Sequence, residues 1–183
     1  RRTEITMNES KPAIRLHRYP DKRSLTEAAS RLFVDAAASA IAERGRFAVA
    51  LAGGSTPRDL YARLAEKDLA ASVQWTRVNV FFGDERCVPA THADSNFKMA
   101  SESLLWHVPV PPVNQFRIRG EDPNVEGAAS EYEKKMKAFF APEPLPRFDL
   151  VLLGLGPDGH TASLFPGIPA LRETKRWAVP VIG

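Results

Sequence analysis

The chain has little cysteine and no long apolar segment. Its 183 residues include one cysteine, Cys87, which excludes a disulfide within the chain and favours a reducing compartment. No apolar stretch reaches the ~18 residues that a membrane-spanning helix needs. The N-terminal letters RRTEITMNESK carry charge, but the apolar segment of a signal peptide does not follow them. These absences predict a cytoplasmic protein that is not attached to a membrane.

The chain also lacks a concentrated basic region. Its 25 Lys and Arg residues exceed its 22 Asp and Glu residues by three, but they are scattered along the sequence. Nucleic-acid interfaces need clustered basic residues, often with interleaved aromatic residues, so no nucleic-acid partner is expected. The spacing of His, Cys, Asp and Glu matches no metal site, and we expect neither a metal nor a cofactor. A weakly positive protein suits an anionic small substrate without requiring one.

Apolar residues occur in the short runs that are typical of buried strands. The clearest runs cover residues 47–52, 78–82 and 148–153, and the last of them reads as a strand buried on both faces. Weaker strand patterns cover residues 13–19, 115–118 and 177–182.

Helical patterns separate these runs. The first is expected to begin at a capping box formed by Ser24 and Glu27 and to end near Gly45. A second helix is expected to begin with Pro57 as its first residue. Two further helices are expected to cover residues 95–105 and 124–140. The alternation predicts an α/β, Rossmann-like fold with a mostly parallel sheet and helices on both faces, in a single domain.

Three of the predicted strands run directly into polar loops. The loops read GGSTPR after residues 47–52, GDERC after residues 78–82 and GPDGHT after residues 148–153. Because the carboxyl ends of parallel strands lie at one edge of a sheet, we expect the three loops to share one pocket.

The first loop has the features of a phosphate site. Gly53 and Gly54 allow backbone N–H groups to face a ligand, and the following helix N-terminus adds partial positive charge. Ser55 and Thr56 can donate hydrogen bonds, and Arg58 can supply formal charge. The Gly-Lys-Ser/Thr ending of a Walker loop is absent. A simple helix cap is the alternative, but it does not explain the glycine pair, so a phosphate site is favoured.

The other two loops carry candidates for acid-base chemistry. Asp84 can act as an acid, a base or an acceptor for a substrate hydroxyl, and Arg86 can hold a phosphate. A surface ion-pair cluster is an equally good interpretation of this loop. In the third loop, Asp158 stands two residues before His160, where it can orient the imidazole or stabilise its charged form. This favours a catalytic pair over a histidine bonded only to backbone.

The glycines of the third loop permit another interpretation. Gly154, Gly156 and Gly159 satisfy the G-x-G-x-x-G fingerprint of dinucleotide-binding proteins. That fingerprint requires a full helix next, whereas Pro166 limits any helix here to about two turns. We therefore favour a small-molecule site over NAD, with Gly156 and Gly159 as substrate-binding residues. Backbone N–H groups of this loop are candidates for stabilising a negatively charged oxygen.

Four segments in order along the chain carry a family resemblance: ALAGGSTPRDLY (50–61), VFFGDERCVP (80–89), DSNFKMA (94–100) and LLGLGPDGHTASLFPG (152–167). Together they resemble 6-phosphogluconolactonases, within the larger group that includes glucosamine-6-phosphate deaminases. In deaminases a glutamate follows the histidine five residues later, where this chain has Phe165, and a tyrosine tends to replace Arg86. Both differences favour the lactonase.

The resemblance implies hydrolysis of 6-phospho-D-glucono-1,5-lactone to 6-phosphogluconate, a step of the oxidative pentose phosphate pathway. It implies His160 as the general base, with Asp158 and Asp84 as further catalytic residues. The alternatives are a glucosamine-6-phosphate deaminase/isomerase and a non-catalytic phosphosugar-sensing domain. Members of this family continue beyond a position like Gly183, so residues 1–183 are expected to lack a C-terminal strand and helix. We expect a monomer or a small homo-oligomer.

Overall fold

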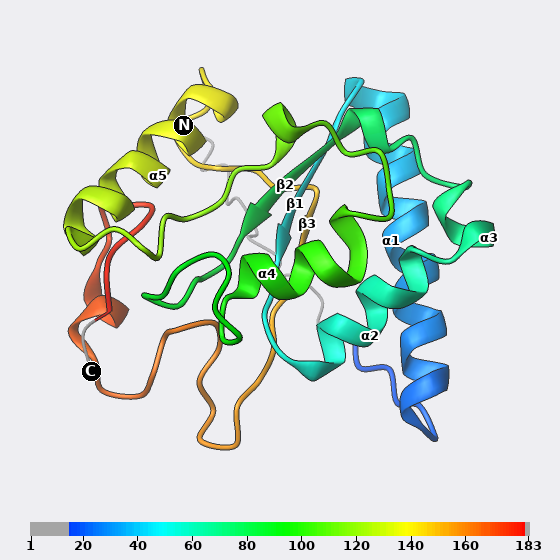
Figure 1. Cartoon of the computed structure of the whole chain (residues 1–183), viewed down its shortest axis with the longest axis horizontal. Coiled ribbons are helices and arrows are strands. Elements are labelled where there is room, and N and C mark those ends of the chain that lie inside the picture. Colours follow the sequence, from blue (N-terminus) through cyan, green and yellow to red (C-terminus); the bar gives the residue numbers. More distant parts are fainter. Residues whose placement is uncertain (1–14, 182–183) are drawn as a thin grey trace, which may run out of the picture.

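The computed structural model of the protein describes residues 15–181. Three parallel strands form its sheet in the order β2-β1-β3 (Figure 1). β1 (Phe47–Leu51) pairs along its whole length with β2 (Val78–Phe82), and Val49 of β1 also lies opposite Leu150 of β3 (Leu150–Val151). This confirms the predicted parallel sheet.

Helices cover both faces of this sheet, as predicted (Figure 1). The α-helices are α1 (Lys22–Arg44), α2 (Ser55–Leu64), α3 (Lys67–Ala70), α4 (Asn96–Ala100) and α5 (Val125–Phe140). One turn of π-helix, Ser101–Leu105, continues α4. The two together confirm the predicted helical segment over 95–105, with Ser95 as its N-cap. Short 3-10 helices cover Trp75–Arg77, Pro112–Asn114 and Pro169–Arg172. In the part of the chain that the structure describes, no helix has the length and apolar character to cross a membrane.

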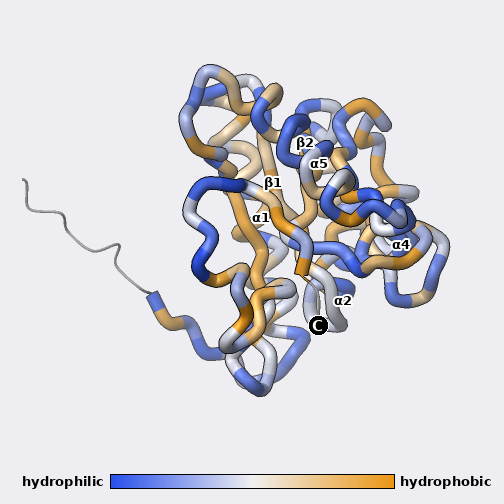
Figure 2. Tube along the Cα trace, turned by 90° about the vertical axis from the view of Figure 1, so that its left-hand side faces the viewer, coloured by the Kyte–Doolittle hydropathy of each residue, from blue (hydrophilic) through white to orange (hydrophobic). Residues whose placement is uncertain are grey.

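The alternation of side chains along β1 creates two cores. Phe47, Val49 and Leu51 pack with residues of α1 and α2 on one face of the sheet. Ala48 and Ala50 face the other way and pack with Tyr132, Met136 and Phe140 of α5. Successive residues of a strand point to opposite faces, so a strand covered on both sides must be apolar throughout. Figure 2 shows the apolar course of β1 inside the molecule and hydrophilic segments around it.

Two helices begin before their predicted positions. The N-cap of α1 is Asp21, whose Oδ1 accepts a hydrogen bond from the Ser24 N–H at 2.7 Å, so the predicted capping box is wrong. An aspartate caps a helix as well as a serine does, and it lies earlier in the chain. α2 begins at Ser55, so Pro57 is its third residue. The predicted end of α1 is confirmed by Gly45, with φ of 71°.

Three strand predictions are wrong or only partly correct. Residues 15–19 and 177–181 contain no strand, and residues 13, 14 and 182 lie outside the described residues. Leu16 is 76% exposed, which shows that two alternating apolar residues do not suffice without a surface to pack on. In the segment 115–118, only Gln115 forms a bridge, to Val80.

β3 is shorter and more exposed than its sequence predicted. It comprises two residues, with Val151 47% exposed, so burial on both faces is a wrong prediction. Among the described residues β3 is a terminal strand of the sheet, paired with β1 on one side. An edge position leaves part of an apolar strand uncovered.

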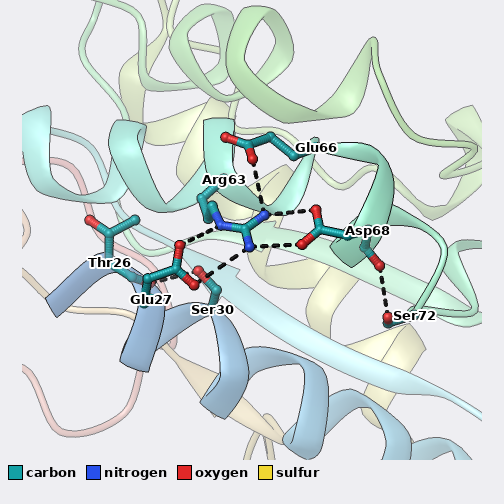
Figure 3. A network of polar contacts seen from close by, with 7 residues as sticks. All are labelled: Thr26, Glu27, Ser30, Arg63, Glu66, Asp68 and Ser72. Carbon is teal, nitrogen blue, oxygen red and sulfur yellow. Dashed lines mark hydrogen bonds and ion pairs between the residues drawn. The ribbon is translucent and has the colours of Figure 1, made fainter. Parts of the chain in front are cut away.

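A network around Arg63 joins the helices that lie beside α2 (Figure 3). The guanidinium of Arg63 contacts Glu27 of α1 at 2.7 Å and Asp68 of α3 at 2.8 Å. It also contacts Glu66 at 3.1 Å. Because Arg63 lies in the last turn of α2, this network fixes the C-terminal end of that helix against α1 and α3.

Candidate active site

The three polar loops meet at the carboxyl edge of the sheet, as predicted. They enclose a cavity of about 270 Å³ near the start of α2. A wider groove of about 820 Å³ runs along α1, but none of the predicted site residues lines it. The cavity is lined by residues 52–57, Gly83, Asp84, Arg86, Asn96, residues 152–156, His160 and Ala162.

Two buried tyrosines fix the points at which the strands end and the loops begin. The Tyr61 hydroxyl accepts a hydrogen bond from the Ala52 N–H and donates one to the Ala52 carbonyl, both at 2.9 Å. Tyr132 makes the same pair of contacts with Phe82, again at 2.9 Å. Burial raises the pKa of both phenols, so both stay protonated and can donate. The backbone that enters the first two loops is therefore anchored.

The first loop presents the N-terminus of α2 to the cavity. The N-cap is Gly54, whose φ of 101° favours glycine, and no side chain of the described residues caps this helix. The N–H groups of Ser55 and Thr56 therefore lie at an uncapped, partially positive helix end. Arg58 is exposed and does not line the cavity, so its position does not support the predicted phosphate contact.

Arg86 brings formal positive charge to the same cavity. It lines the cavity and is exposed, and within residues 15–181 it forms no ion pair. The backbone behind it packs on Gly120, where a Cβ atom would lie 2.1 Å from the Arg86 carbonyl oxygen. An unpaired guanidinium beside an uncapped helix N-terminus suits a phosphate group.

The third loop holds His160 and Asp158 in contact. Nδ1 of His160 lies 2.5 Å from Oδ1 of Asp158, which also accepts a hydrogen bond from the His160 N–H at 3.3 Å. The contact with the imidazole is the main cause that lowers the pKa of Asp158. Because Nδ1 faces the carboxylate, Nε2 is the ring nitrogen left for a substrate. The predicted pairing of these two side chains is confirmed.

Gly156 makes room for the His160 ring, and Gly159 allows the loop to turn. A Cβ atom at Gly156 would lie 2.2 Å from Cε1 and Nδ1 of His160, so the ring packs directly on this glycine. The Gly156 N–H donates to the His160 carbonyl at 2.8 Å, and the Gly159 N–H donates to the Gly156 carbonyl at 3.0 Å. Both N–H groups are used inside the loop, so neither is free to stabilise a substrate oxygen. Gly159 has a φ of 86° and does not line the cavity.

Phe165 covers the imidazole. The centroids of the Phe165 and His160 rings lie 4.5 Å apart, and the ring planes are inclined by 36°. An aromatic ring in this position gives the imidazole an apolar neighbour beside its carboxylate partner.

Sequence reasoning missed three residues that organise the site. The Glu85 carboxylate accepts hydrogen bonds from the N–H groups of Asn96 and Phe97, at 2.7 and 2.9 Å, and so holds the start of α4. Asn96 and Ser163 both donate to the Asp84 carboxylate, at 3.1 and 2.6 Å. Asn96 lies in the DSNFKMA segment, which was the only signal in the sequence that could have pointed to it.

The sequence matches the family model described as glucosamine-6-phosphate isomerases/6-phosphogluconolactonase over residues 20–182. A protein of Oryza sativa subsp. indica named probable 6-phosphogluconolactonase 3, chloroplastic, is 42% identical over 161 residues, which cover 84% of this chain and 49% of the rice protein. The 6-phosphogluconolactonase of Nostoc sp. is 41% identical over 159 residues, covering 86% and 65%. The chain thus spans about half of the rice protein and just under two thirds of the Nostoc protein.

Solved structures agree with these matches. The 6-phosphogluconolactonase of Trypanosoma brucei has a TM-score of 0.77 and 36% identity, covering 92% of this chain and 69% of that one. A monomeric glucosamine-6-phosphate deaminase of the NagB superfamily has a TM-score of 0.65 at 21% identity, covering 77% and 55%, and shows the fold alone. The α/β fold with a parallel sheet is therefore the fold of these proteins.

Proposed function

Because the chain belongs to the family of glucosamine-6-phosphate isomerases and 6-phosphogluconolactonases, we propose that it carries the active site of a 6-phosphogluconolactonase. The reaction is the hydrolysis of 6-phospho-D-glucono-1,5-lactone to 6-phosphogluconate, in the oxidative pentose phosphate pathway. The observation that carries the proposal is that the His160–Asp158 pair and the uncapped start of α2 lie around one cavity. The His160–Asp158 pair suits general-base catalysis, and the uncapped start of α2 suits the binding of a phosphate group.

The substrate phosphate would bind at the N-terminus of α2, near Ser55 and Thr56, with Arg86 supplying the opposite charge. A phosphate held at one end of the cavity fixes the position of the lactone carbonyl at the other. Holding the reactants in this way removes much of the entropic cost of bringing them together.

Hydrolysis then needs one base and one water molecule. Nε2 of His160 accepts a proton from water as the water oxygen attacks C1 of the lactone, and Asp158 stabilises the resulting imidazolium. The bond between C1 and the ring oxygen breaks, and the ring oxygen takes the proton from His160. The product has a hydroxyl at C5 and a carboxylic acid at C1, which ionises in water.

The deaminase alternative is disfavoured by Phe165. Its ring packs on His160, and the resemblance to deaminases would require a glutamate at this position. A phenylalanine cannot supply the proton transfers of sugar ring opening and amine loss. The sensor alternative is disfavoured by the His160–Asp158 contact, which phosphosugar binding alone does not require.

Location and assembly remain our proposals. We place the protein in the cytoplasm, although some relatives carry the name chloroplastic. A monomer or a small homo-oligomer that uses neither a metal nor a cofactor fits the proposed chemistry. Among the described residues no group of three or more His, Cys, Asp and Glu side chains could hold a metal ion.

The decisive experiment compares lactone loss with the spontaneous rate in the natural gene product that contains this chain. Wild type is expected to accelerate hydrolysis of lactone generated in situ, and His160→Ala to lower the catalysed rate by about 100-fold or more. His17→Ala is the matched control, because His17 is exposed and does not line the cavity. If the wild-type protein leaves the spontaneous rate of lactone hydrolysis unchanged but releases ammonia from glucosamine 6-phosphate, the proposed lactonase function is wrong and the deaminase function takes its place.

A further inference from the structure

We propose that Asn96 and Ser163 are positioning residues that hold the catalytic loop against the phosphate loop through the carboxylate of Asp84. The inference rests on the proposed function, because it assigns how the lactonase site is held together. Asp84 follows β2 and lies between the other two loops.

Each oxygen of the Asp84 carboxylate has its own donor. Oδ1 accepts a hydrogen bond from Nδ2 of Asn96 at 3.1 Å, and Oδ2 accepts one from Oγ of Ser163 at 2.6 Å. The Asn96 amide also donates to the Asp84 carbonyl at 3.1 Å. Hydrogen bonds to an ionised carboxylate are stronger than those between neutral groups, so this is a firm junction.

Asn96 connects this junction to the phosphate loop. Its side chain is 5% exposed and lies so close to Gly53 that a Cβ atom there would be 2.0 Å from Oδ1 of Asn96. Asn96 cannot move far, because its backbone N–H is bonded to Glu85 at 2.7 Å. One buried amide therefore contacts the phosphate loop on one side and Asp84 on the other.

Ser163 connects the junction to the catalytic loop. It stands three residues after His160, and between them Thr161 forms a bridge to Leu164. Ala162 has a φ of 50°, an unusual value for a residue other than glycine, which persists only where neighbouring contacts impose it. The Leu164 N–H closes this turn by donating to the Thr161 carbonyl at 2.9 Å, and the bond from Ser163 to Asp84 joins the turn to another segment.

This arrangement gives Asp84 the role of an anchor instead of the proton-transfer role expected from the sequence. Both of its oxygens are engaged by groups of the protein, whereas His160 has a ring nitrogen free for the substrate. The anchor would set the distance between the phosphate and the imidazole. Errors of ~1 Å in such a distance can cost ~100-fold in rate.

The kinetic test uses Ser163→Ala and Ser163→Thr. Ser163→Ala is expected to lower kcat about tenfold and to change KM less than about twofold, since the phosphate contacts are untouched. Ser163→Thr retains the hydroxyl and is expected to restore kcat to within about threefold of wild type. In an Asp84→Ala background, Ser163→Ala should have little further effect, because both changes break the same contact. Additive losses would overturn the proposal.

A second measurement does not depend on activity. The NMR signals of the His160 ring should shift or broaden in Ser163→Ala and in Asn96→Ala, and Ser163→Thr should resemble wild type. Ser39→Ala is the matched control, because the exposed Ser39 hydroxyl donates to Glu43 within α1 and, among residues 15–181, to no residue of the site. Unchanged His160 signals in Ser163→Ala would overturn the positioning role even in an active enzyme. Perturbed signals in a protein without lactonase activity would support the positioning role and reject the proposed function.

Discussion

The contact between Gly156 and His160 is a tight steric constraint at the residue scale. We predict that Gly156→Ala lowers kcat at least tenfold, because a Cβ atom 2.2 Å from the imidazole must push the ring away from Asp158. The melting temperature should change by less than about 2 °C, since the loop is mostly exposed. Lactone kinetics and thermal unfolding measure the two effects.

Gly154 of the same loop supplies the control for this prediction. A Cβ atom there meets no protein atom within 4 Å, so Gly154→Ala should leave the NMR signals of the His160 ring unchanged, whereas Gly156→Ala should shift them. Equal shifts in the two variants would show that crowding of His160 by the Cβ atom added at position 156 is not the cause.

Residues that act within one loop could be predicted, and residues that act between loops could not. Asp158 and His160 are two positions apart, so a turn brings them together. Asn96 meets Gly53 and Asp84 only after β1, β2 and α4 have packed, and its type and neighbours in the sequence do not reveal these contacts. The contact between Asp158 and His160 could therefore be predicted from the sequence, whereas the contacts of Asn96 could not.

At the scale of the elements, Arg63 ties α2 to its neighbouring helices. Its side chain is 17% exposed and meets carboxylates of Glu27, Glu66 and Asp68 (Figure 3). We predict that Arg63→Ala lowers the melting temperature at pH 7 by roughly 2–4 °C. Lys22→Ala is the control, because the ion pair of Lys22 with Asp59 is about half exposed and should matter little.

The same network predicts a dependence on pH. The hydrogen bond from Arg63 is the main cause that lowers the pKa of Asp68 from 3.8 to about 2, and it also lowers the pKa of Glu27. A carboxylate whose pKa is lower in the folded state stabilises that state fully at pH values above its pKa in the unfolded chain. This stabilisation is lost as the pH falls through its pKa in the folded protein. The difference in melting temperature between wild type and Arg63→Ala should therefore be constant near neutral pH, begin to shrink below pH 4.5, and shrink further below pH 3.8. A difference that persists at pH 2 would assign the effect to packing of the Arg63 side chain.

Strands covered on both faces were the elements most readable from the sequence. β1 and β2 are apolar at almost every position because two cores demand it, and their predicted bounds agree with the structure to within one residue. The terminal patterns failed because a strand also needs a neighbour to pair with. Residues 15–19 and 177–181 have strand-like sequences but pair with no strand among the described residues.

At the scale of the whole molecule, the site follows from the topology. Because β1, β2 and β3 are parallel, the loops that follow them meet at one edge of the sheet, although they are far apart in the sequence. Parallel order could be predicted from the alternation of strands and helices, so the shared pocket could be predicted as well. The depth of the cavity and the separation of its charged groups depend on contacts between the loops, so they could not be predicted from the sequence.

The same topology leaves β3 at one edge of the sheet, and this predicts how the 183-residue chain behaves in isolation. Val151 is 47% exposed on a terminal strand, and Leu153 and Leu155 after it are 61% and 82% exposed. An apolar, unpaired edge favours association with other chains, and a lysine on such an edge opposes it. We expect the isolated chain to self-associate with rising concentration in sedimentation velocity, and Val151→Lys to reduce this association. Leu16→Lys is the control, because Leu16 is an exposed apolar residue that does not belong to the sheet. If Leu16→Lys reduces the association as much as Val151→Lys does, general surface hydrophobicity causes the association and the edge of β3 does not.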